Sequence, residues 1–176
     1  MLAAAAYMIV FRIVHILAGI FWAGSVYLFV VFVQPSVAAI APAGAPFMAE
    51  LLGKRKLVDV LIGLGSTTVI GGLFLYWHDW HLYGSFGKWV SSRFGADLTV
   101  GAIAAIVALV IGIVGTRPNV ERLLAMGRQV AEAGGPPSPE MAAEIARTQV
   151  RLKLLARVSF GLIVVAALAM AIGRYL

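Results

Sequence analysis

The chain has 176 residues, of which 61% are hydrophobic and only 12% charged, and its formal net charge is +6. Because soluble domains are about half apolar and a quarter charged, this composition excludes an ordinary soluble domain and indicates an integral membrane protein. The absence of cysteine excludes disulfides, thiolate metal sites and thiol catalysis. The positive charge does not indicate a nucleic-acid partner, because the basic residues lie beside apolar runs.

Four apolar segments are long enough, or nearly so, to cross about 30 Å of hydrocarbon as helices. They cover residues 7–33, 57–77, 97–115 and 154–175. The first has no basic residues before it and is longer than the core of a signal peptide, so we expect an uncleaved span that ends at Pro35. These segments predict a single transmembrane domain over residues 1–176, with the all-α fold of a polytopic four-helix bundle.

Residues 116–153 connect the third and fourth spans, and they predict a helical hairpin. The stretch "GGPPSP", residues 134–139, favours a turn, after which Ser138 is placed to cap a helix with Pro139 in its first turn. Nothing interrupts the helical pattern from there to the fourth span. We therefore expect spans three and four to extend out of the membrane as a cytoplasmic hairpin, either as a solvated extension or as a docking surface for a partner.

The distribution of lysine and arginine predicts the orientation of the spans. The connections after spans one and three, with the start of span four, carry ten basic residues, and the opposite side carries four. By the positive-inside rule, the ten lie in the cytoplasm and both termini lie outside. Asp59, at the cytoplasmic start of span two, is expected to form an ion pair with the basic run Lys54–Lys56.

One face of the first span combines polar and aromatic side chains. Residues three or four apart share a helix face, which aligns Met8, Arg12, His15, Gly19 and Trp22. At about 1.5 Å of rise per residue, His15 lies on the order of 10 Å inside the outer end of the span. A polar group at this depth is a candidate site. Alternatively, His15 only bonds a neighbouring helix, and Arg12 only extends outward to the membrane surface.

The two other histidines lie in "YWHDWHLYG" at the outer end of span two. His78 and His81 share a face if the helix continues that far. Since imidazole is a ligand for copper, zinc and haem iron, and thioether is a ligand for Cu(I), the candidate metal ligands are His15, His78, His81 and Met8. The alternatives are that both later histidines are ordinary interfacial residues and that Met8 only packs.

The first span also carries a resemblance to a known family. "FRIVHILAGIFWAGSVYLFVVFVQP" resembles the first span of the family that includes the membrane domains of copper-resistance protein D (CopD) and the HemJ-type protoporphyrinogen oxidases. The matching positions are His15, Trp22 and Gly24. The resemblance implies four spans in a bacterial-type inner membrane and, in the HemJ branch, b-type haem at the first-span histidine. That branch also has a histidine at the start of span three, where this chain has Arg93 and Asp97 instead.

Two hypotheses follow. In the first, haem b or copper is bound near the outer face, with His15 as the first ligand and His78 or His81 as the second. Arg12 would pair with a haem propionate, and Trp22 would lie on the same helix face as His15. In the second, the chain is a non-catalytic accessory subunit or scaffold of a larger membrane complex, with another membrane protein or a further copy of itself as partner. No nucleophile–base pair, P-loop or zinc-protease motif occurs, so the sequence leaves open whether the protein is an enzyme.

Overall fold

The computed structural model describes residues 2–41 and 43–175, with the backbone alone for residues 2–5 and 174. Helices make up almost all of this part of the chain, and none of it is a strand. The elements in chain order are α1 (Leu2–Leu28), η1 (Phe29–Val33), α2 (Gln34–Ala39), α3 (Ala45–Ala49), η2 (Glu50–Lys54), α4 (Leu57–Leu82), α5 (Phe86–Ser91), α6 (Arg93–Val110), η3 (Ile111–Thr116), α7 (Arg117–Ala133), α8 (Pro139–Ile172) and η4 (Gly173–Tyr175). The all-α prediction is confirmed.

Four continuous helical rods are long and apolar enough to cross a membrane. They cover Ala6–Ala39, Leu57–Leu82, Arg93–Ala133 and Pro139–Ile172. Lipid offers no hydrogen-bond partners, so each rod satisfies its own backbone groups as a helix. Their outward faces carry Leu, Ile, Val and Phe side chains, as the prediction of a multi-pass membrane protein requires.

Two of the rods continue through prolines. The first was expected to end at Pro35, but α2 carries it on to Ala39, and the third continues through Pro118 in the first turn of α7. The π-helical segments η1 and η3 end two residues before these prolines. Proline has no N–H to donate and clashes with the carbonyl four residues earlier, and a wider π turn relieves both constraints without ending the helix.

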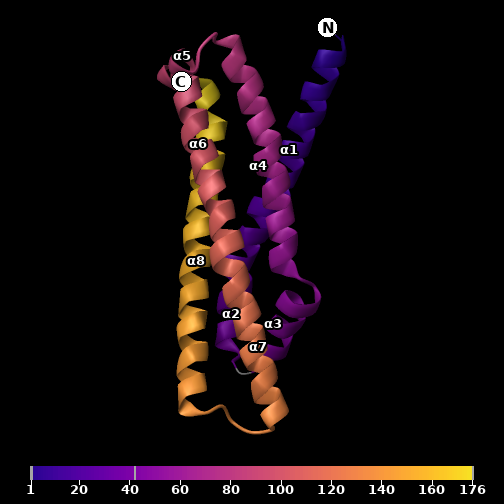
Figure 1. Ribbon diagram of the computed structural model, residues 1–176, viewed down its shortest axis with the longest axis vertical. Helices are drawn as coiled ribbons and strands as arrows, with labels where there is room; N and C mark the ends of the chain where they lie inside the picture. Colours follow the sequence, from indigo (N-terminus) through magenta and orange to yellow (C-terminus); the bar gives the residue numbers. More distant parts are fainter. Residues whose placement is uncertain (1, 42, 176) are drawn as a thin grey trace.

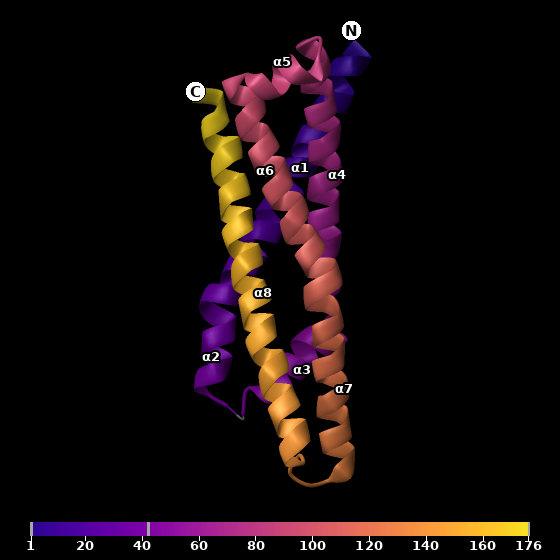
Figure 2. The same ribbon diagram turned by 60° about the vertical axis from the view of Figure 1, so that its left-hand side comes forward.

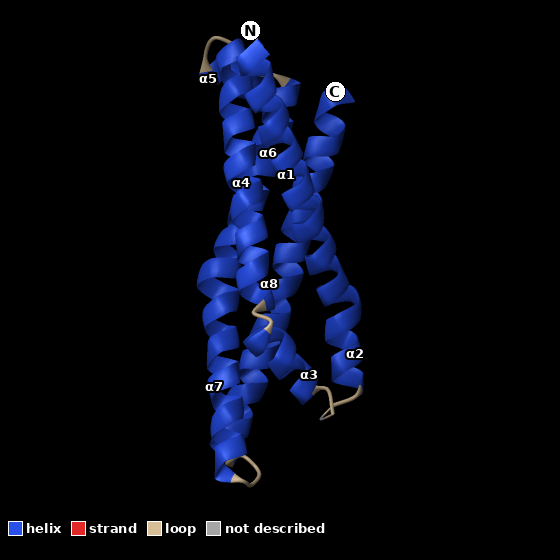
Figure 3. Ribbon diagram, turned by 90° about the vertical axis from the view of Figure 1, so that its right-hand side faces the viewer, coloured by secondary structure: helices blue, strands red, loops and turns tan. Residues whose placement is uncertain are grey.

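The two chain ends and α5 lie at one end of the bundle, and the turn between α7 and α8 lies at the other (Figures 1, 2 and 3). We call these the terminal end and the hairpin end. The hairpin forms as predicted, because α7 ends at Gly134 in the left-handed conformation (φ 65°) and α8 begins after Ser138. The Ser138 hydroxyl accepts a hydrogen bond from the Met141 N–H at 3.2 Å, which caps the helix.

The rods pack as two antiparallel pairs, α1 with α4 and α6 with α8, and contacts between α4 and α6 and between α1 and α8 join the pairs. Small residues allow the close approach that membrane helices require. A Cβ at Gly101 of α6, for example, would lie 3.3 Å from the Ala166 carbonyl oxygen of α8. The buried core at mid-bundle combines these small residues with larger ones: Trp22, Val26, Ala104, Ala105, Ala108, Ile163 and Ala166.

The short helix α5 closes the terminal end between α4 and α6. Its Trp89 is fully buried and packs edge-on against the rings of Tyr76, Tyr83 and Phe94. Helix α6 begins so close to α5 that the Gly95 Cα faces the Trp89 backbone, and a side chain at this position would overlap it. Aromatic packing therefore anchors this end of the α6–α8 pair to α4.

Candidate functional site

The candidate site lies along the interface of α1 and α4, where residues of the two helices face each other at five successive levels. We call this interface the seam. Its facing residues, from mid-bundle to the terminal end, are Trp22 and Gly65, Gly19 and Thr68, His15 and Gly71–Gly72, Phe11 and Phe74, and Tyr7 and His78. On each antiparallel helix these residues recur at intervals of three or four, so they form one stripe.

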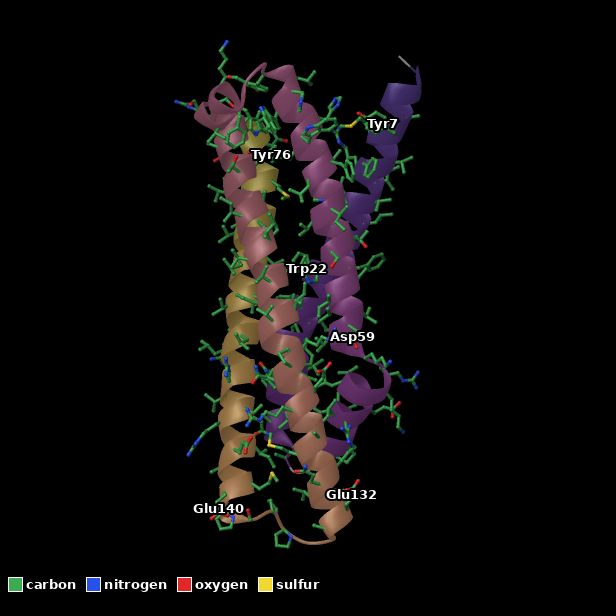
Figure 4. The ribbon with its side chains drawn as sticks, viewed as in Figure 1. Tyr7, Trp22, Asp59, Tyr76, Glu132 and Glu140 are labelled. Atoms are coloured by element: carbon green, nitrogen blue, oxygen red, sulfur yellow. The ribbon has the colours of Figure 1, made fainter. Side chains whose placement is uncertain are left out.

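At mid-bundle, Trp22 fills the space that Gly65 leaves. Trp22 is only 6% exposed. A Cβ at Gly65 would lie 2.9 Å from its Cε2 atom, so glycine is the residue that fits. Figure 4 shows Trp22 in the interior between the rods. This predicted site residue therefore belongs to the hydrophobic core.

His15 is held against α4 by a hydrogen bond and by a glycine. Its Nδ1 lies 2.7 Å from the backbone carbonyl oxygen of Thr68. A Cβ at Gly72 would lie 2.8 Å from its Cε1 and 3.0 Å from its Nδ1, so the ring rests on the Gly72 backbone. A carbonyl only accepts hydrogen bonds, so Nδ1 is the donor, and in the corresponding neutral tautomer the lone pair is on Nε2.

Toward the terminal end, the seam carries a second polar contact. The Tyr7 hydroxyl and the His78 Nδ1 are hydrogen-bonded at 3.3 Å, and the view in Figure 4 places Tyr7 high on α1 beside α4. The Asp79 carboxylate lies within electrostatic range of His78 and Arg12. Sequence spacing does not indicate Tyr7, Thr68 and Gly72, because only the register of the two helices places them beside the histidines.

His81 lies on the exposed surface of α4. Helix α4 continues to Leu82, as the His78–His81 hypothesis required. The His81 Nδ1, however, is bonded within the helix to the Trp77 carbonyl oxygen at 2.8 Å, and the ring lies against the indoles of Trp77 and Trp80 at centroid distances of 4.7 and 5.1 Å.

The three histidines thus have three separate partners. His15 is level with Gly71, and His78 follows Gly71 by seven residues, which corresponds to about 10 Å along the helix axis. In the described residues no group of three or more His, Asp or Glu side chains is placed to hold one metal ion. Of the predicted ligands, His15 and His78 lie on the seam at different levels, whereas Met8 is half-buried outside its facing residues and His81 is exposed. The predicted set therefore does not meet at one point.

At the hairpin end, Asp59 does form an ion pair, but with a different partner from the one expected. The Arg117 Nε lies 3.0 Å from the Asp59 carboxylate and 3.2 Å from that of Glu121. Of the neighbouring basic run, Lys54 and Arg55 pair with Glu50 instead. The physical reason is that η3 and α7 bring Arg117 beside the start of α4, a contact between distant segments that sequence spacing does not reveal.

Comparison of the chain with protein-family models, with curated proteins and with solved structures finds no match.

Proposed function

We propose that this chain is an integral membrane protein that uses His15 to bind the iron of haem b, or a copper ion, near the terminal end, in redox chemistry or metal handling. The observation that carries the proposal is the hydrogen bond of 2.7 Å between His15 Nδ1 and the Thr68 carbonyl oxygen. Metal-binding histidines almost always donate their second ring N–H in this way, which fixes the tautomer and increases the basicity of the ligating nitrogen.

The set of available ligands favours haem over copper. A porphyrin supplies four nitrogens of its own, so one histidine is enough to hold it. A bare copper ion needs several protein ligands, and His78 lies about 10 Å further along α4 than the level of His15. Arg12 is exposed one turn from His15 toward the terminal end, where its guanidinium would pair with a propionate.

Bound haem would supply one-electron redox chemistry. The chain's own contribution would be to hold the ligating ring still, because the Thr68 carbonyl oxygen bonds its Nδ1 and the Gly72 backbone packs against the ring. The resemblance of His15, Trp22 and Gly24 to the CopD and HemJ motif supports the same residue as ligand. It also supports a bacterial-type inner membrane, and the distribution of lysine and arginine supports a cytoplasmic hairpin end.

The test is the absorption spectrum and metal content of protein purified in mild detergent from cells supplied with haem precursor or copper. We expect a Soret band with reduced-minus-oxidised α and β bands, or stoichiometric copper, that His15→Ala abolishes. His81→Ala is the matched control, because His81 is an exposed imidazole on the same seam helix and its loss should leave the spectrum unchanged. Wild-type protein without either signal would refute the proposal.

A second candidate function is that of an accessory subunit, and the observation that favours it is the hairpin. Helices α7 and α8 continue beyond the apolar part of their rods as a polar pair with a turn at residues 134–138 (Figures 1 and 2). Such an arm has the form of a docking element. Cross-linking in intact membranes from a residue of the arm, such as Glu132→Cys, should capture one defined neighbour. A chain that cross-links to nothing and purifies only as a monomer would argue against this role.

A further inference from the structure

A polar cleft opens between α7 and α8 in the hairpin. It has a volume of about 740 Å³, and its walls include Asn119 and Arg122 on α7 and Glu144, Arg147, Thr148 and Arg151 on α8. Thr148 is buried at its base and donates its hydroxyl to the Glu144 carbonyl oxygen at 2.9 Å. The Asn119 amide likewise donates to the Gly115 carbonyl oxygen at 2.6 Å. Both polar side chains are thus bonded within their own rods, whereas Arg147 and Arg151 are exposed.

Two of the three guanidinium groups of this cleft form no ion pair, and with its two carboxylates the formal charge of the cleft is +1. Its carboxylates are Glu140 and Glu144, and Glu144 forms an ion pair with Arg122 across the cleft. Glu140 lies in the first turn of α8 at the tip of the hairpin (Figure 4). Arg147 and Arg151, one turn apart on α8, have no acidic partner among the described residues.

The position of these two arginines along α8 sets the kind of anion they can meet. The apolar part of α8 begins at Leu154, which is 61% exposed, and continues through Val158 toward the terminal end. Arg151 precedes Leu154 by three residues and Arg147 by seven, so their backbones lie about 5 and 10 Å outside this boundary. Lipid phosphates lie at this level, since headgroup regions surround the hydrocarbon core.

We infer that the cleft binds the phosphate of an anionic phospholipid headgroup, held by Arg147 and Arg151. Arginine matches phosphate with two parallel N–H donors, and basic pockets between helices at a membrane face are suited to anionic lipids. Glu144 is already paired with Arg122, and the remaining carboxylate, Glu140, lies at the tip of the hairpin, so the phosphate is expected on the side of Arg147 and Arg151. The lipid would then fix the hairpin relative to the membrane surface.

The test uses the full chain in detergent, with phosphatidylglycerol added as probe and native mass spectrometry or a thermal shift as readout. We expect saturable binding of phosphatidylglycerol and none of phosphatidylcholine. Each arginine that holds the phosphate contributes a factor of at least about five to such binding through its charge-assisted hydrogen bonds. Arg147→Gln with Arg151→Gln should therefore weaken binding by about thirtyfold, and either single variant by about fivefold.

The matched control is Lys153→Gln with Arg157→Gln, which removes the same charge from exposed positions of the same helix outside the cleft. This control should keep most of the affinity. Equal loss in both double variants would overturn the inference, because it would indicate diffuse attraction to the basic surface. Inorganic phosphate that binds as tightly as the lipid would also overturn it. If the double variant fails to fold, the single variants provide the same comparison.

Discussion

Gly65→Ala should destabilise the bundle, because its new Cβ has no room. In the structure that atom would lie 2.9 Å from Trp22 Cε2, 3.0 Å from Trp22 Cζ2 and 3.2 Å from Leu109 Cδ1. The indole is rigid and buried, so it cannot move aside without disturbing the core around it. Overpacking of this kind costs about 1–3 kcal/mol, whereas alanine in a helix interior gains up to about 1 kcal/mol over glycine.

Gly63→Ala is the control that separates these two effects. Gly63 lies on the same helix, two residues earlier, and a Cβ added there would meet no atom within 4 Å. Gly63→Ala should be stabilised by the higher helix propensity of alanine without any clash. The free energies of unfolding of the two variants should therefore differ by about 1–3 kcal/mol. Titration with SDS in mixed micelles, followed by tryptophan fluorescence, measures this difference. Equal stability of Gly65→Ala and Gly63→Ala would refute the packing of α1 on α4 described above.

Three further predictions concern the terminal end, and the same unfolding titration tests them. Gly95→Ala should lower the free energy of unfolding most, by about 3 kcal/mol or more, because its Cβ would overlap the Trp89 carbonyl oxygen. A variant as stable as wild type would contradict the placement of α5. Ser92→Ala should cost about 1 kcal/mol, since its hydroxyl accepts from the Gly95 N–H at 3.0 Å and caps α6, and an unchanged midpoint would exclude that cap. Thr99→Val should lower the free energy of unfolding by about 0.5–1.5 kcal/mol, because it removes the hydrogen-bond partner of the Tyr76 hydroxyl at 2.7 Å. In a Tyr76→Phe background the same substitution should cost less. If the two substitutions lowered stability additively, the bond would be contradicted.

Hydropathy and capping patterns predicted the rods and the hairpin because these depend on local sequence. Ser138 and Gly134 bound the turn where the pattern placed it. The ends of the first and third spans were harder to place, because a proline ordinarily ends a helix. Here π turns precede Pro35 and Pro118, and no propensity scale separates a broken helix from one that widens for a single turn.

The candidate site was predicted in part. Helical periodicity correctly put His15 and Trp22 on one face of α1, and that face meets α4. What periodicity could not supply was the register of the two helices, which decides that His15 meets Thr68 and Gly72 while His78 meets Tyr7. Sliding one helix by two turns would have brought the imidazoles together, so the expected common centre depended on a quantity that sequence spacing does not contain.

Helix α8 runs from Pro139 to Ile172 as regular α-helix throughout. Its polar part, residues 139–153, is about 22 Å long. A stiff rod behaves as a lever, so a tilt of about 10° where it crosses the bilayer displaces its far tip by about 4 Å. Changes in bilayer thickness would thereby reach the tip of the arm as mechanical movement, without any rearrangement of the side chains along the way.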